Sequence, residues 1–332
     1  MTDLIDVHSH DYPDSYLDAC KREDSGFTHY YRDDGRLIVL QDGGVALAAP
    51  QPLPPPEHRI GMMDDAGVAV QVLSVSAPNV YRFPASIRIP LTREVNDEFA
   101  DRVAGSEGRL RMLASLPLPD VDEALSELGR ALGLPGVVGI VLCSNLDGIT
   151  LDDERLAPLY EELSRRKTTV FVHGNVPCST EGLREYAMAL AMGFMADPLF
   201  AIGRLVYSGT IDRYPGINWI FAHLGGTVPF VLPRYDNYYK QFPECREKID
   251  RPPSEIIREL YFDTCTMHPP ALRCAVDTLG ADRLVFGSDY PHVPGGIDRF
   301  VEILNSIGLP DDELSMIGRA TAARLLGISE AA

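Results

Sequence analysis

The sequence predicts a (β/α)8 barrel, an α/β fold in which eight parallel strands alternate with helices. Eight short apolar runs recur along the 332 residues, and helical sequence follows most of them. The runs are almost continuously apolar, as is typical of strands that are buried on both faces of a parallel sheet. A doubly wound open sheet is the alternative fold. It is less favoured because no glycine-rich dinucleotide-binding turn follows the first strand.

The first strand is predicted at residues 4–10, and a segment of different character follows it at about residues 11–57. This segment contains a turn-like Asp33-Asp34-Gly35, a strand-like run at 36–40 and a proline cluster at 50–56. Proline interrupts helices and strands alike. We therefore expect a small insertion after the first strand, with a hairpin that ends in a stiff connector over the mouth of the barrel.

From residue 58 onward, strands and helices alternate regularly. Further strands are predicted at residues 68–75, 110–116, 136–142, 168–173, 217–223, 261–265 and 283–287. Helices are predicted at about residues 58–67, 92–105, 120–132, 153–166, 185–212, 228–240 and 269–279, and further helices complete the chain. No internal repeat or linker divides this pattern, so residues 1–332 are expected to form a single domain that carries the insertion.

The composition limits the partners that this chain can bind. The formal net charge is −18 and the isoelectric point is near 4.8, so the basic surface that nucleic acid or an anionic membrane requires is not expected. An anionic small substrate remains compatible with this charge, because a metal ion and one or two arginines can dominate the local field. No stretch approaches the roughly 20 apolar residues that span a bilayer. We therefore expect no nucleic-acid partner and no membrane partner.

The cysteines and the N-terminus predict a cytoplasmic protein. None of the six cysteines forms a C-x-x-C pair, and in a chain of this length they are expected to be reduced thiols. Asp3 and Asp6 stand where a signal peptide would carry positive charge before a long apolar core. Cys143 and Cys265 are expected to be small apolar fillers.

Histidines at the predicted strand ends indicate a metal site. His8 and His10 are two residues apart in an extended strand, so their side chains point to the same side. His173 ends the fifth strand, His223 ends the sixth, and Asp289 follows the eighth. In a (β/α)8 barrel these ends meet at the face that carries the active site. Because imidazole is the commonest metal ligand, four histidines and an aspartate at this face predict a metal centre.

These residues and their flanking motifs resemble the amidohydrolase superfamily, in particular its branch of 2-amino-3-carboxymuconate-6-semialdehyde decarboxylase and related metal-dependent decarboxylases. The similar motifs keep their order along nearly the whole chain. They are Asp6–His10, Met63–Val68, Val172–His173, His223–Gly226, Arg234–Asn237, Arg251–Glu255 and Gly287–Pro291. The resemblance implies the same barrel and a metal-dependent enzyme.

The resemblance implies that one divalent metal, usually zinc and sometimes manganese, is ligated by His8, His10, His173 and Asp289. Imidazoles with one carboxylate suit zinc, although the geometry can favour manganese. No organic cofactor is implied. His223 matches the histidine that the family keeps beside the metal as a catalytic acid and base. The alternative is that His223 serves as a fourth imidazole ligand.

The substrate side departs from the decarboxylase that the motifs resemble. That enzyme has an arginine in the insertion that grips a substrate carboxylate, whereas residues 42–56 contain no arginine or lysine. The substrate is therefore not expected to be the muconate semialdehyde itself. Arg59 lies beyond this stretch and is expected to cap or pack the short helix. Arg234 matches a family arginine that reaches into the neighbouring subunit's pocket, which implies a homodimer, and a surface arginine is the alternative.

Other polar residues are candidates for supporting roles. His268 and His292 lie in loops at the catalytic mouth and are candidate substrate contacts, with exposed or hydrogen-bonding residues as the alternative. Asp263, near the end of the seventh strand, is expected to orient a ligand histidine. His29 and His58 have no strand-end placement and are expected at the surface.

Two reactions on a small-molecule carboxylate or acyl substrate fit these residues. In a decarboxylation, His223 moves a proton so that the carbon bearing the carboxylate becomes tetrahedral before carbon dioxide leaves. In a hydrolysis, water with a pKa lowered by the metal towards about 7 attacks an ester, lactone or amide, and His223 and Asp289 move the proton. The resemblance favours decarboxylation of a small aromatic or unsaturated carboxylic acid. A non-enzymatic metal-binding protein is disfavoured because the ligand set is complete.

Overall fold

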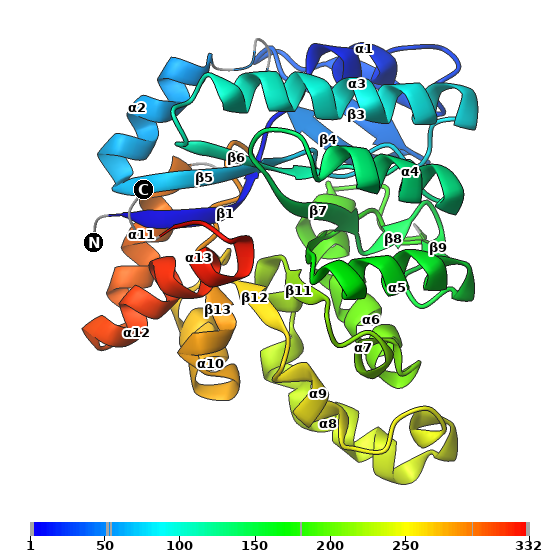
Figure 1. The fold of residues 1–332 in the computed structure, drawn as a ribbon, viewed down its shortest axis with the longest axis vertical. Coiled ribbons are helices and arrows are strands. Elements are labelled where there is room, and N and C mark those ends of the chain that lie inside the picture. Colours follow the sequence, from blue (N-terminus) through cyan, green and yellow to red (C-terminus); the bar gives the residue numbers. More distant parts are fainter. Residues whose placement is uncertain (1–2, 51–52, 54, 180, 294, 330–332) are drawn as a thin grey trace.

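The computed structural model describes residues 3–50, 53, 55–179, 181–293 and 295–329. At its centre, eight parallel strands form one sheet in the order β1, β5, β6, β7, β10, β11, β12 and β13 (Figure 1). Their bounds are β1 Leu4–His10, β5 Val68–Ser74, β6 Leu110–Ala114, β7 Val137–Cys143, β10 Thr169–His173, β11 Asn218–Phe221, β12 Tyr261–Asp263 and β13 Leu284–Val285. Helices flank these strands, so the prediction of a (β/α)8 barrel is confirmed.

The sheet closes into a barrel through the segment that follows β13. The amide of His10 donates to the carbonyl oxygen of Tyr290 at 2.7 Å, and the amide of Asp289 donates to the carbonyl oxygen of His8 at 2.7 Å. An isolated parallel bridge pairs Ser9 with Tyr290. The end of β1 is therefore bonded both to β5 and to the last strand unit, which brings the first and last motifs of the sequence together.

Apolar side chains pack on both faces of the strands, as their composition requires. Inside the barrel, a cluster that includes Ile5 and Phe171 is almost fully buried, and a larger cluster packs outward against the helices. The C-terminal helix α13 (Thr321–Leu326) joins the inner cluster at the end where the strands begin. There the hydroxyl of Thr169 donates to the carbonyl oxygen of Leu325 at 2.6 Å. Polar side chains lie at the opposite end of the barrel, where the strands finish.

The helices that follow the strands agree with the predicted alternation. They are α2 Pro56–Ala66, α3 Ala85–Ala104, α4 Val121–Ala131, α5 Ala157–Arg166, α6 Phe194–Tyr207, α7 Thr210–Arg213, α8 Val228–Gln241, α9 Pro253–Ile257, α10 Pro269–Leu279, α11 Gly296–Ser306, α12 Asp311–Ser315 and α13. The predicted start of α3 near Thr92 was wrong, because the helix begins at Ala85 and contains Pro90. A proline removes one helical hydrogen bond and so favours a boundary in the sequence, whereas here the helix continues through Pro90, its sixth residue.

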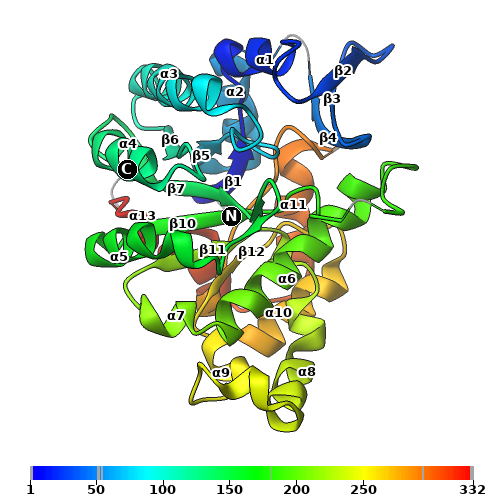
Figure 2. The same cartoon turned by 90° about the vertical axis from the view of Figure 1, so that its right-hand side faces the viewer.

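The insertion holds more structure than the predicted hairpin. It comprises α1 Asp14–Cys20 and an antiparallel sheet of β2 Thr28–Tyr31, β3 Leu37–Gln41 and β4 Gly44–Ala49 (Figure 2). The strands β3 and β4 meet at Asp42-Gly43, where φ is 50° and 84°. Asp-Gly is a favoured hairpin turn when both residues have positive φ, so this pair was a missed signal for β4. Residues 51, 52 and 54 of the expected stiff connector lie outside the described residues.

One stretch of the described chain, Ala189–Tyr207, is long and apolar enough to cross a membrane by length and composition alone. This differs from the expectation that no such stretch exists. The stretch consists of the π-helical turn η2 (Ala189–Gly193) and α6, and 56% of its most apolar window is buried inside the protein. A helix that packs against a barrel wall has the same composition, so the stretch is weak evidence for a membrane span.

Candidate metal centre

Three histidines and one aspartate converge at the end of the barrel where the strands finish. They are His8, His10, His173 and Asp289, and one possible ligand atom from each lies within 4.8 Å of the others. Oδ1 of Asp289 lies 3.1 Å from Nε2 of His10 and 3.3 Å from Nε2 of His8. The two Nε2 atoms lie 3.0 Å apart. The structure therefore brings together all four residues that the resemblance assigned to the metal.

The second ring nitrogen of each histidine is held by another group. Nδ1 of His8 contacts the carboxylate of Asp263, which is the orienting contact expected from the sequence. Nδ1 of His10 lies 3.1 Å from the hydroxyl of Ser74, and Nδ1 of His173 lies 2.7 Å from the carbonyl oxygen of the next residue. Such contacts fix the orientation of a ligand ring and leave Nε2 available for a metal.

Buried atoms without partners indicate that a metal ion fits this site. Nε2 of His173 and Oδ1 of Asp289 are buried and make no hydrogen bond within the described structure. Buried polar atoms normally have a partner, because losing water without a replacement costs free energy. Imidazole nitrogens and a carboxylate oxygen are donors for zinc or manganese. The four residues therefore fit one divalent metal ion.

Burial and neighbouring charges set the protonation states of these ligands. Burial lowers the pKa of His10 to about 3, and it lowers the pKa of His173 well below its usual range. Burial also lowers the pKa of His8, but the carboxylates of Asp263 and Asp289 outweigh it and raise that pKa well above its usual value. Burial raises the pKa of Asp289, yet nearby His8 and His10 bring it well below its usual range. In the metal-free site Asp289 is therefore an anion, His10 and His173 are neutral, and His8 holds a proton that metal binding would displace.

His223 lies beside the four convergent residues. It begins the 3-10 turn η3 (His223–Gly225) after β11, and only 9% of the residue is exposed. Its ring centre lies 4.9 Å from that of His8 and 5.3 Å from that of His173, and burial lowers its pKa. With His8 and the buried thiol of Cys265 it forms a second group that could hold a metal. The alternative of His223 as a ligand therefore has a structural basis of its own.

A tight turn directs His223 towards the centre. The φ angles of His223 and Leu224 are 54° and 56°, and two glycines with positive φ follow them. A Cβ at Gly225 would lie 2.8 Å from the ring of Phe262, and a Cβ at Gly226 would lie 2.0 Å from the carbonyl oxygen of residue 195. Glycine is thus required here by packing and by backbone conformation.

A cavity of about 600 Å³ opens over the convergent residues. His173, His223 and Asp289 line it, together with mostly apolar side chains from β4, from the segment around η2 and from the loops after β12 and β13. The apolar lining includes Ala46, Leu47, Leu190, Phe194, Met195, Val293 and Phe300. Its described lining contains no lysine or arginine.

The two loop histidines both line this cavity. His268 is exposed at its edge. Nε2 of His292 lies 2.5 Å from the hydroxyl of the buried Tyr12, and its ring centre lies 5.2 Å from that of His10. His292 is therefore held in the wall near the metal ligands, and substrate contact by either histidine stays a prediction. His29 and His58 are exposed, as expected.

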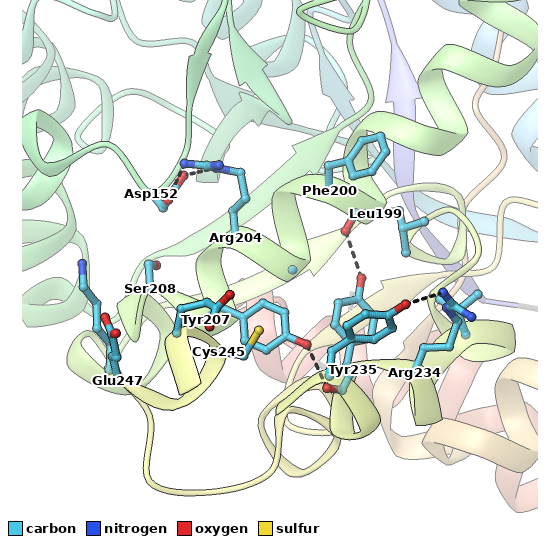
Figure 3. Close-up of a pocket in the computed structure, with 15 residues that line it drawn as sticks. Asp152, Leu199, Phe200, Arg204, Tyr207, Ser208, Arg234, Tyr235, Cys245 and Glu247 are labelled. Carbon is cyan, nitrogen blue, oxygen red and sulfur yellow. Dashed lines mark hydrogen bonds and ion pairs between the residues drawn. The ribbon is translucent and has the colours of Figure 1, made fainter. Parts of the chain in front are cut away.

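Arg234 lies away from the metal cavity of its own chain. It is exposed on α8, where its guanidinium donates to the hydroxyl of Tyr238 at 3.2 Å and stacks 5.4 Å from the centre of that ring. It borders a separate cavity of about 840 Å³ between α6 and α8, together with Phe200, Tyr207 and Tyr235 (Figure 3). We call this second cavity the α6–α8 groove.

Some polar neighbours of the centre could not be found from the sequence. Arg59 was expected to cap or pack its helix, but its side chain instead leaves α2 and donates to the carbonyl oxygen of His10 at 2.8 Å. Tyr12 and Ser74, which hold His292 and His10, were also missed. For Ser74, a polar residue at the end of a strand was an available signal.

Comparisons with known proteins identify the family of this chain. The family model described as amidohydrolase matches residues 5–328. A 2-amino-3-carboxymuconate-6-semialdehyde decarboxylase of Dictyostelium discoideum is 26% identical over 330 residues, which cover 95% of this chain and 91% of the relative. A gamma-resorcylate decarboxylase of Rhizobium sp. (strain MTP-10005) is 27% identical over 290 residues, which cover 83% of this chain and 88% of the relative.

The likeness extends to solved structures. The crystal structure of a 5-carboxyvanillate decarboxylase from Sphingomonas paucimobilis has a TM-score of 0.85 and 24% identity, and the match covers 99% of this chain and 100% of the other. At this identity the likeness supports the fold alone. Because the family model spans nearly the whole sequence, the chain belongs to the amidohydrolase family.

Proposed function

We propose that this chain is a metal-dependent decarboxylase of a small aromatic carboxylic acid. The observation that supports this most is the group of three oriented imidazoles and a buried carboxylate oxygen without a hydrogen-bond partner, which lies beside His223 and reaches the cavity through His173 and Asp289. The curated relatives that match most of this chain bear decarboxylase names, which supports the choice of reaction.

We assign one zinc ion to His8, His10, His173 and Asp289, with manganese as the alternative. The donor set supports this assignment, because imidazoles with one carboxylate suit both metals, and metal binding would displace the proton that His8 holds in the metal-free site. When bound, the metal polarises a substrate oxygen and stabilises the negative charge that develops there. No organic cofactor is needed for the reaction.

In this proposal the chain's own residues move one proton. His223, whose ring is neutral in the free site, takes this proton from solvent as the anionic substrate binds and donates it to the ring carbon that carries the carboxylate, which becomes tetrahedral. The bond to the carboxylate carbon then breaks, its electron pair restores the aromatic ring, and carbon dioxide leaves. The ionised Asp289 keeps the charge balance of the site. The apolar walls limit access of water during these steps.

The lining of the cavity supports a substrate with a single carboxylate. Because the described lining has no lysine or arginine, a second anionic group would find no cation within the same chain. Leu190, Phe194 and Phe300 provide apolar surface for a planar ring. We therefore propose a benzoate with one or two hydroxyl groups, and His268 and His292 as candidate contacts to those groups.

The test is to supply purified protein with hydroxybenzoates that carry a ¹³C label in the carboxyl group. Release of labelled carbon dioxide with formation of the matching phenol is expected. Esters and lactones of the same acids, tested in parallel, address the hydrolase alternative. Hydrolysis of these compounds without release of labelled carbon dioxide from any acid would contradict the proposal. His29→Asn, which changes an exposed histidine of β2, is the matched control and should leave the rate unchanged.

We further propose a homodimer in which Arg234 reaches the partner's cavity and pairs there with the single carboxylate of the substrate. Two observations support this. Arg234 is exposed on α8, and the same region exposes large aromatic side chains, with 63% of Phe200 and 82% of Phe230 accessible. Exposed aromatic surface next to arginine is typical of a protein interface.

We place the enzyme in the cytoplasm. All six cysteines are free in the described structure, and Cys20, Cys143 and Cys265 are buried. Free thiols suit a reducing compartment.

A further inference from the structure

A buried polar network lies next to the metal ligands without supplying a ligand itself. Its cation is Arg59 on α2, of which only 4% is exposed. The guanidinium donates to the carbonyl oxygen of His10 at 2.8 Å and to the side-chain oxygen of Gln71 at 2.7 Å. Arginine is rarely buried unless its donors are used. Here one of those donors binds the main-chain carbonyl oxygen of His10, which is one of the four proposed metal ligands.

The network continues from Gln71 to the loop that carries Asp289. The side-chain amide of Gln71 donates to the carboxylate of Asp6 at 2.8 Å. That carboxylate also accepts hydrogen bonds from the amide of Ser288 at 3.0 Å, from its hydroxyl at 2.6 Å and from the amide of His8 at 3.1 Å. Asp6 therefore joins the residue before Asp289 to the main chain of His8.

Arg59 also contacts the residue on the other side of Asp289. Its guanidinium carbon lies 4.8 Å from the centre of the Tyr290 ring, a favourable cation–π distance. The amide of His10 in turn donates to the carbonyl oxygen of Tyr290 at 2.7 Å. Arg59 thus touches both segments that close the barrel, and each segment carries a metal ligand.

We propose that Arg59 is a positioning residue of the metal centre, which holds the His10 and Asp289 segments at the separation that one metal ion requires. A guanidinium suits this role because its rigid fork binds two acceptors and its flat face stacks on a ring at the same time. Ligand atoms only 3.1 Å apart tolerate little displacement. The proposal rests on the metal centre and is independent of whether the enzyme decarboxylates or hydrolyses its substrate.

Neutralisation of a nearby carboxylate is a weaker explanation for the burial of Arg59 beside the metal ligands. The Asp11 carboxylate lies 4.0 Å from Arg59, but it is already paired with Arg102 at 2.6 Å. A lysine at position 59 would keep the positive charge and lose the fork. The Arg59→Lys variant should therefore keep only part of the metal affinity of the unchanged protein.

Arg88 offers a matched control within the same chain. It is also buried, with 8% exposed, and it also donates to main-chain oxygens, those of Tyr81 and Phe83. Its carboxylate partner is Asp120, and none of these contacts is a metal ligand. Arg88→Met removes a buried guanidinium as Arg59→Met does, but at a distance from the centre.

The experiment titrates metal-depleted protein with Mn²⁺ and records both the affinity and the electron paramagnetic resonance spectrum. We expect both methionine variants to lose thermal stability. Only Arg59→Met should bind Mn²⁺ on the order of 10- to 100-fold more weakly and change the spectrum, as loss of a group that orients ligands does. Arg59→Lys should lie between Arg59→Met and the unchanged protein.

Equal affinity and an identical spectrum in Arg59→Met and Arg88→Met would overturn the proposal. If Arg59→Met does not fold, Arg59→Lys and Gln71→Met carry the test, and unchanged Mn²⁺ binding in both would overturn it. The readout needs no substrate. A failure to find decarboxylase activity is therefore distinguishable from a failure of this inference.

Discussion

The metal cavity and the α6–α8 groove differ in the polar atoms that they bury. The groove is larger, about 840 Å³ against about 600 Å³, but none of its described lining residues buries a side-chain polar atom without a hydrogen-bond partner. Arg204 there pairs with Asp152 at 2.7 Å, and the hydroxyl of Tyr235 donates to a main-chain oxygen (Figure 3). The metal cavity instead has Nε2 of His173 and Oδ1 of Asp289 buried without hydrogen-bond partners.

The difference teaches that cavity size does not identify the reactive site. A satisfied polar group has no free energy to gain from a ligand, whereas a buried unsatisfied group gains a partner when a ligand binds. The metal cavity is therefore organised around an ion, and the groove is organised around exposed aromatic surface that a second protein can cover. Each prediction below changes one of these two regions.

The largest effect is expected from Asp289→Ala. Removing this ligand should reduce bound metal from about one equivalent to near zero and reduce turnover on the order of 10⁴-fold, because the charge stabilisation supplied by the metal is lost. Elemental analysis and rate measurement check both numbers. Asp152→Ala in the groove removes a carboxylate paired with arginine, and it should change neither the metal content nor the turnover. Retention of metal by Asp289→Ala would remove the distinction between the two cavities.

His223→Asn tests the division of roles inside the metal cavity. If His223 is the acid and base, the variant should keep its metal and lose turnover by a factor on the order of 10² to 10⁴. Joint loss of metal and turnover would instead identify His223 as a ligand, with His8 and Cys265 as its neighbours. His58→Asn, at an exposed position of α2, is the control. Normal metal with near-normal turnover would contradict both roles.

Arg234→Ala tests whether the groove serves the cavity of a second subunit. Loss of a charge-assisted hydrogen bond to substrate should lower kcat/KM on the order of 10- to 100-fold, and Lys240→Ala on the same helix should not. Hybrid dimers of Arg234→Ala and His223→Asn subunits should regain activity, since one site per hybrid then has both residues intact. A fully active monomer by light scattering, or hybrids without recovery, would leave Arg234 as a surface residue.

The sequence predicted the parts of the molecule that depend on local pattern. The apolar strands follow from periodicity, and the gathering of four histidines and Asp289 follows from the rule that strand ends meet at one face of a barrel. The choice of His8, His10, His173 and Asp289 among them came from the family resemblance. His223 was placed at the end of a strand, whereas the structure places it past β11 in a turn of positive φ. Backbone conformation of this kind in a residue other than glycine has no reliable sequence signal.

Long-range side-chain contacts could not be predicted. Arg59 stands at the start of a helix, where arginine is usually exposed, and its target on β1 is defined only when the barrel closes. The partner of Arg234 depends on a second chain, which a single sequence does not describe. The missed strand β4 is a different case, because Asp42-Gly43 was a usable local signal.

The smallest effect is expected in the stability of the metal-free protein between pH 7 and pH 5. The pKa of His10 in the folded state is about 3, against 6.5 for a free histidine, so the unfolded chain binds the proton first as the pH falls. Stability from this ring is fully present above about pH 6.5 and is lost as the pH falls towards 3. At pH 5 the loss is roughly 2 kcal/mol, because one pH unit corresponds to about 1.4 kcal/mol.

Other groups modify this slope in known directions. Burial also lowers the pKa of His173 and of His223. These two rings therefore reduce the stability further as the pH falls, as His10 does. Burial raises the pKa of Asp6 and Asp197, and these groups act in the opposite sense. Total stability is therefore a poor readout, and the informative quantity is the difference between the unchanged protein and His10→Gln.

Urea unfolding of chelator-treated protein at pH 7 and pH 5 supplies that difference. His10→Gln lacks the titrating ring, so its stability should fall by roughly 2 kcal/mol less than that of the unchanged protein. His29→Asn, at an exposed position of β2, should fall as much as the unchanged protein does. Equal losses in all three proteins would mean that His10 is protonated in the metal-free cavity. A protonated His10 would donate a hydrogen bond to Oδ1 of Asp289, so this oxygen would no longer lack a partner, and the contrast with the α6–α8 groove would no longer hold.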